Sequence, residues 1–143
     1  MAVLYATEAT GYLNSAVPSL PAGAIHGGQL RRYRASITLA SQATTDTIVL
    51  CRLHAGQAVA YGIMTSSVTL GSSTVAIGIT GSTGKYRAAA TFTAVNTPTL
   101  FGPTAATMAA APTTAEETIF VTIAAADLPS SGTLVIDLYV SGT

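Results

Sequence analysis

From Arg32 onward the sequence alternates between apolar and polar residues with a period of two, and this pattern limits the fold most strongly. Residues 33–39, for example, place Tyr33, Ala35, Ile37 and Leu39 on one face and polar side chains on the other. Alternate residues of a strand point to opposite faces, so each such segment predicts a half-buried strand. Comparable segments, separated by turn-forming residues, follow at 57–65, 74–80, 117–123 and 133–140. Residues 46–53 are instead almost continuously apolar, which predicts a buried strand.

A few segments are less regular. Residues 86–93 contain an Ala-rich run with helix propensity, but the neighbouring Thr and Phe residues favour a strand. Residues 68–70 read as a short strand, and residues 94–115 as a long loop with room for one helical turn. In 57–65 we expect Val59, Tyr61 and Ile63 to share one face. The chain is therefore predicted to be all-β with about eight short strands: a β-sandwich with a jelly roll as leading topology, and a barrel as the alternative.

The first thirty residues lack any such period. Pro18, Pro21 and several Gly and Ser residues interrupt regular structure, yet apolar residues are scattered throughout. We interpret residues 1–30 as an extended N-terminal arm that lies on a surface, either of its own sandwich or of a neighbour. Residues 31–143 then form the sandwich domain.

Charged residues make up 8% of the chain, against about 25% in ordinary soluble domains, and the net charge is zero. The apolar excess lies in small side chains, since the chain has 26 Ala and 23 Thr. So little charge argues against a disordered tail, a coiled coil or a protein that coats nucleic acid. It favours a surface that is covered by a partner. We see no signal peptide and no apolar run long enough to span a membrane.

Residues that carry chemistry are few. The stretch 78–85 resembles a phosphate-binding loop, but Ile79 stands where the motif needs Gly, and Tyr86 follows the lysine instead of Ser or Thr. We expect the only cysteine, Cys51, to be a small core residue. His26 and His54 lack a nucleophile-elbow motif beside them, so a small hydrolase remains only if His54 proves essential. We therefore predict no enzyme activity, no metal and no cofactor.

The densest charge cluster is Arg31, Arg32 and Arg34, which surround Tyr33. Such a group can bind phosphates, but no second basic cluster supports a nucleic-acid role. Guanidinium groups bind carboxylates equally well, so we prefer a protein partner.

Several stretches, at 37–46, 68–78, 84–90, 97–102 and 122–134, resemble small head-decoration (cement) proteins of tailed bacteriophages. The resemblance implies a β-rich module on the outside of the head, usually a trimer near local three-fold axes, that clamps neighbouring major-capsid subunits. It implies no catalytic residues. We thus expect a virion protein on the capsid exterior, made in the host cytoplasm, with the major capsid protein as partner and neither nucleic acid nor membrane.

In this hypothesis the sandwich faces form the homotrimer, and the arm with the arginine segment binds the shell. The candidate partner-binding residues are Tyr5, Tyr12, Leu13, Leu20, Arg31, Arg32 and Arg34. The alternative is a carbohydrate- or host-surface-binding module, because jelly rolls host many lectins. For that role Tyr61, Tyr86 and Tyr139 would be the rings that stack on sugars.

Overall fold

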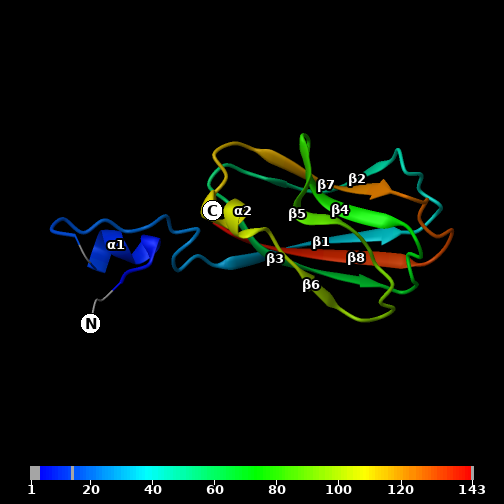
Figure 1. Ribbon diagram of the computed structural model, residues 1–143, viewed down its shortest axis with the longest axis horizontal. Coiled ribbons are helices and arrows are strands. Elements are labelled where there is room, and N and C mark those ends of the chain that lie inside the picture. Colours follow the sequence, from blue (N-terminus) through cyan, green and yellow to red (C-terminus); the bar gives the residue numbers. More distant parts are fainter. Residues whose placement is uncertain (1–3, 14, 143) are drawn as a thin grey trace.

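The computed structural model describes residues 4–13 and 15–142 and shows a two-layered β-sandwich preceded by a protruding N-terminal segment (Figure 1). No helix of this described part is both long and apolar enough to cross a membrane. The elements are α1 (Thr7–Leu13), β1 (Leu30–Thr38), β2 (Thr47–Leu53), β3 (Ala58–Ser66), β4 (Thr74–Ile79), β5 (Ser82–Thr91), β6 (Thr99–Phe101), α2 (Ala105–Ala109), β7 (Glu117–Ala124) and β8 (Thr133–Ser141).

The strands form two antiparallel sheets of four, in the orders β1-β8-β3-β6 and β2-β7-β4-β5. The first strand pairs with the last, the second with the seventh, the third with the sixth and the fourth with the fifth. This is the pairing of one long hairpin rolled into two sheets, which is the jelly-roll topology. The predicted β-sandwich is confirmed, and the barrel alternative is wrong.

The core lies between the sheets and follows the alternation of the sequence. In β8 the inward side chains are Leu134, Ile136, Leu138 and Val140, none more than 1% exposed. Those of β7 and β4 meet them from the other sheet: Ile119, Val121, Ile123, Val75 and Ile77. Burying each such side chain contributes roughly 1.5–3 kcal/mol, so this interior holds the two layers together.

In β3 the predicted face is partly wrong. The register between β3 and β8 shifts between Val59 and Tyr61, a bulge that puts one extra residue into β3. Val59 is buried as expected, but Tyr61 and Ile63 lie on the outer face, and Met64 faces the core instead. A bulge reverses the alternation of every residue beyond it, and the apolar pattern gave no sign of one.

The less regular segments also differ in part from the prediction. Residues 86–93 are mostly strand, as favoured, because β5 covers Ser82–Thr91. The loop at 94–115 contains the expected helical turn, α2, but also the three-residue strand β6. Residues 68–70 form no strand, so β6 takes the place of that segment among the eight. Three residues are too few to show a period, and β6 forms by pairing with β3.

Candidate partner-binding arm

The sequence predicted a fully extended arm, and this is wrong in part because the arm contains the short helix α1. Beyond the helix the chain folds back, and the amide of Ser19 donates to the carbonyl oxygen of Gly11 at 2.9 Å. Figure 1 shows α1 beyond the end of the sandwich where the C-terminus and α2 lie. This part of the arm therefore does not rest on its own sandwich, which leaves a neighbouring molecule as the surface we predict for it.

Most of the large apolar side chains that stand exposed in the described residues belong to this segment. They are Leu4, Tyr5, Leu13, Val17, Leu20, Ile25 and Leu30, against Val49, Val95, Leu100 and Met108 in the rest of the chain. Leu20 is 84% exposed and Leu13 59% exposed. Single exposed apolar residues are ordinary, but such a concentration in about thirty residues favours the prediction that a partner covers this segment.

Of the two tyrosines among the predicted contact residues, Tyr12 already packs against another residue of this chain. The ring of Tyr12 meets the ring of His26 edge to face, with centroids 5.4 Å apart. Tyr12 is half-buried, whereas Tyr5 is exposed. Tyr12 therefore helps to hold the helix against the root of the arm, and Tyr5, Leu13 and Leu20 are the predicted residues that remain open to a partner.

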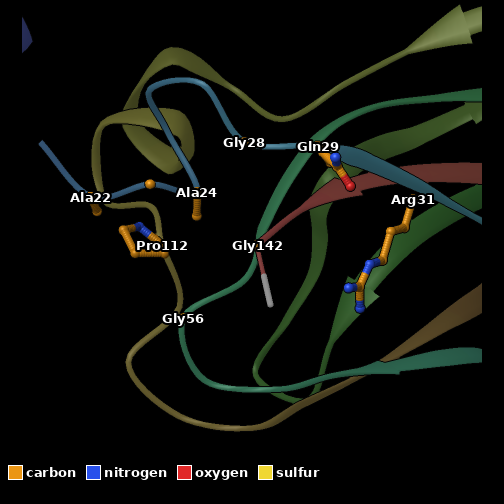
Figure 2. A pocket seen from close by; sticks show the side chains of 9 residues that line it. Ala22, Ala24, Gly28, Gln29, Arg31, Gly56, Pro112 and Gly142 are labelled. Atoms are coloured by element: carbon orange, nitrogen blue, oxygen red, sulfur yellow. The ribbon is translucent and has the colours of Figure 1, made fainter.

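The root of the arm and the sandwich enclose a groove between them. The hydroxyl of Ser141 donates to the carbonyl oxygen of Ala24 and so joins the arm to β8. Within the arm, the carbonyl oxygen of Ala22 accepts hydrogen bonds from the amides of Ile25 and His26. The groove, of about 460 Å³, is lined by Ala22, Gly23, Ala24, Gly28, Gln29, Arg31, Gly56, Pro112 and Gly142. Figure 2 shows Ala22, Ala24 and Pro112 on one side of it and Gln29 and Arg31 on the other. Its walls are small and mostly apolar, with one cation.

The structure separates the three arginines that the sequence grouped. Arg31 and Arg32 are exposed, and no described carboxylate lies within 4.0 Å of either guanidinium. Arg34 instead donates from Nε and Nη2 to the two carboxylate oxygens of Asp137, at 2.8 and 2.7 Å. Its planar fork is therefore occupied within the chain, and Arg31 and Arg32 remain the groups that can bind a partner's carboxylates.

Asp137 lies on the outer face of its sheet yet is only 7% exposed. The hydrogen bonds from Arg34 hold the pKa of its carboxyl below the usual range. A carboxylate on an outer sheet face is ordinarily solvated, so side chains around Asp137 shield it. Sequence spacing gave no signal for the pair, since 103 residues separate its members.

A second ionic cluster, which the sequence did not reveal, lies at the arm end of the sandwich. Glu117 accepts hydrogen bonds from Lys85 Nζ at 2.5 Å and from the Tyr86 hydroxyl at 2.7 Å. Burial, followed by the hydrogen bond to Glu117, raises the pKa of Tyr86 far above its usual value. Strand order brings these residues together across 31 positions, so no local motif could have predicted them.

The two histidines considered for catalysis lie in different surroundings. Glu116 lies beside His54, with Oε2 3.4 Å from His54 Nδ1, and its Oε1 is 3.3 Å from Arg52 Nη1. His26 packs against the ring of Tyr12. Residues 78–85, which superficially resemble a phosphate-binding loop, form the hairpin between β4 and β5. Cys51 is half-buried, and burial raises the pKa of its thiol to about 11. Across residues 4–13 and 15–142, His, Cys, Asp and Glu side chains form no group of three suited to a metal ion.

Comparison with known proteins finds similarity in structure but not in sequence. No protein-family model matches the chain, and no curated protein matches it significantly. A chain in the capsid of Ralstonia phage GP4 superposes with a TM-score of 0.63 at 19% identity, over 81% of this chain and 86% of that one. A chain of the cyanophage Pam1 capsid asymmetric unit matches over the full length of both chains, with a TM-score of 0.60 and 17% identity.

A third match comes from the acidic stable capsid structure of the Helicobacter pylori bacteriophage KHP30. Its TM-score is 0.58 at 11% identity, over 78% of this chain and 86% of that chain. At such low identities the likeness concerns the fold. The chain shares its jelly-roll fold with chains found in three phage capsids.

Proposed function

We propose that this chain is a structural, non-enzymatic protein of a phage virion that decorates the outside of the head. It would bind the major capsid protein and stabilise its lattice, as a homotrimer, by non-covalent contacts. Neither nucleic acid nor membrane is a partner in this proposal. Synthesis would take place in the host cytoplasm, before the protein joins the capsid exterior. The fold shared with chains of three phage capsids supports the virion assignment.

The observation that carries the proposal is the exposed apolar arm. Leu13 and Leu20 face no part of the sandwich, and covering both on a partner would contribute roughly 3–6 kcal/mol before ordering costs. A segment of this kind would be a liability on a free protein, since it favours association. On a shell, many copies of such a contact can add up to a stable clamp without one strong site.

Charge supports the same contact. Arg31 and Arg32 lie at the base of the arm without a described carboxylate partner, so they can bind acidic groups on the shell beside the apolar segment. Charged groups at the rim of an interface add specificity and speed more than affinity. We therefore assign affinity to the arm and orientation to the two arginines.

The carbohydrate-binding alternative has less support from the aromatic residues. Tyr86 is 3% exposed and bonded to Glu117, so its ring is not open to a sugar. Tyr61 and Tyr139 stack on each other, with centroids 4.7 Å apart and planes at 20°. Sugar stacking needs a free ring face. The stacked contact occupies one face of each ring, so only the opposite face of each could meet a sugar.

The test is binding to phage heads assembled without this protein, measured by co-sedimentation. Leu13→Asp and Leu20→Asp should each weaken binding at least tenfold, because either change removes more than about 1.4 kcal/mol of apolar contact. Val49→Asp is the matched control, since Val49 is 63% exposed but lies on the sandwich. Unchanged binding of a variant that carries both leucine substitutions would exclude the arm as the shell-binding element. Absence of binding by the unaltered protein would refute the proposal itself.

A further inference from the structure

Each sheet of the sandwich ends in two edge strands, which have a hydrogen-bonded neighbour on one side only. β1 and β6 are the edges of one sheet, and β2 and β5 are the edges of the other. Open edges invite a further strand, and proteins protect them with bulges, short strands or charged side chains. β6 has only three residues, and register shifts interrupt the pairing of both β2 and β5. These three edges are therefore poor templates for another strand.

The edge formed by β1 lacks that protection. Its nine residues, Leu30–Thr38, pair with β8 in one register without a shift. Every second residue of an antiparallel edge strand points its amide and carbonyl groups away from the paired neighbour, which gives β1 about four or five such residues. Among the described residues, no hydrogen bond from outside the β1–β8 ladder reaches the backbone of residues 30–37. β1 thus presents a long, regular and unpaired template.

The side chains along β1 determine which charge a further strand should carry. Arg32 and Arg34 are exposed and occupy alternate positions of the strand, and β1 contains no acidic residue. Asp137 already binds Arg34, whereas no described carboxylate lies within 4.0 Å of Arg32. Side chains of an added strand would lie directly opposite these arginines, where opposite charges stabilise the pairing. The edge therefore fits an extended segment with carboxylates at alternate positions.

A second copy of this chain does not meet that requirement. Full-length antiparallel pairing of two β1 strands places Arg34 opposite Arg34, and like charges directly opposite each other destabilise a strand pair. No two acidic residues of the chain are separated by a single residue, because they stand at Glu8, Asp46, Glu116, Glu117, Asp127 and Asp137. A strand with alternating carboxylates must therefore come from another protein.

We propose that β1 binds an extended acidic segment of the shell protein by strand addition, so that this segment extends the sheet β1-β8-β3-β6 beyond β1. The inference rests on the proposed capsid role and specifies how Arg32 and Arg34 take part in it. The arm leads directly into β1 (Figure 1), so a shell protein that the arm holds lies close to this edge. Main-chain hydrogen bonds would add to the affinity of the arm, and the alternate side chains would supply specificity.

The test is residue-resolved amide hydrogen exchange of the full chain, free in solution and bound to heads assembled without it. In the free protein, amides on the open side of β1 should exchange at least about a hundredfold faster than amides bonded to β8. On heads, protection should rise at least about tenfold at alternate residues of β1, because strand addition bonds every second amide. β5 is the internal control, since this edge strand of the other sheet should exchange as it does in the free protein.

A charge reversal tests the chemistry of the partner. Arg32→Glu alters an exposed side chain without a described carboxylate partner, so the fold should persist. It should weaken binding to heads about threefold to thirtyfold in co-sedimentation, because it replaces an attraction with a repulsion. Ala89→Glu is the matched control, since it places a carboxylate at an exposed position of β5 and should leave binding unchanged. Parental binding by Arg32→Glu would overturn the acidic partner.

The exchange pattern separates failure of this inference from failure of the capsid role. Binding to heads without alternating protection in β1, or with an equal rise at neighbouring residues, would overturn strand addition and leave the capsid role standing. Absence of binding to heads would overturn both. Protection of β1 that appears in the isolated protein as its concentration rises would assign the edge to a second copy and refute the acidic segment.

Discussion

Substitution of Gly78 by alanine gives a sharp test of how the β4–β5 hairpin is built. A Cβ atom at this position would lie 2.2 Å from the carbonyl oxygen of Ser82 and 2.4 Å from that of Thr83. Both are backbone atoms, so no side-chain rotation relieves the clash. Restoring an ordinary contact requires the two strands to separate by more than about 1 Å.

The expected cost follows from what this separation disrupts. The neighbours Val75 and Ile77 are fully buried and touch the core, so a displaced strand disturbs packing that cannot adapt freely. Overpacking of this kind costs about 1–3 kcal/mol, and weakened ladder hydrogen bonds add about 1 kcal/mol. Alanine also lowers the conformational entropy of the unfolded chain relative to glycine, and this stabilises the native state by about 0.4–1 kcal/mol. The net loss in the free energy of unfolding is therefore about 1–3.6 kcal/mol.

Urea unfolding followed by circular dichroism measures this loss. With an m-value of about 2 kcal/mol/M, the midpoint should fall by about 0.5–1.8 M. Gly102→Ala is the matched control, because the nearest atom to its Cβ lies at 3.8 Å, and its midpoint should stay or rise slightly. Equal midpoints for the two variants would refute the reasoning that β5 approaches β4 too closely for any side chain.

Three further predictions concern the buried polar groups. Tyr86→Phe removes the hydroxyl that donates to Glu117 and should lower the free energy of unfolding by about 1.5–3 kcal/mol in urea titrations; no loss would show that the contact does not stabilise the fold. Asp137 has a lowered pKa in the native state, so its stabilisation is present above the unfolded pKa of about 3.9 and is lost as pH falls through the native pKa. The advantage of the unaltered protein over Asp137→Asn should accordingly shrink between pH 7 and pH 3, and a constant difference would contradict the pairing with Arg34. The Cys51 thiol, with its pKa raised to about 11, should react with Ellman's reagent at pH 8 at least tenfold more slowly in the native protein than in urea, and equal rates would show that it is not shielded.

Most strands could be predicted from the sequence because apolar and polar residues alternate along a half-buried strand. Residues 133–140 alternate without interruption, and β8 occupies Thr133–Ser141 with every second side chain in the core. β6 escaped prediction because three residues hold no period. The wrong face for Tyr61 and Ile63 came from a bulge, a feature of pairing between strands that the pattern of one strand does not contain.

Prediction of the candidate site was less complete, and for a similar reason. The apolar character of the arm was evident, and Tyr5, Leu13 and Leu20 are indeed exposed. The sequence grouped Arg34 with the two neighbouring arginines, but its guanidinium binds Asp137, which the chain places opposite it 103 residues later. Neighbours in sequence share a charge pattern, whereas partners in space depend on strand order.

The amino-acid sequence by itself determined that this chain is all-β, poor in charge and preceded by an apolar segment of different character. Those properties follow from local alternation and composition, which each residue contributes independently of the fold. Only the tertiary structure decided which strands are neighbours. Strand order therefore pairs the carboxylate of Asp137 with Arg34, leaves no room for a side chain at Gly78 and stacks Tyr61 on Tyr139 at one outer face. Such features depend on distances between segments far apart in the chain, and these are fixed when the long hairpin rolls into two sheets.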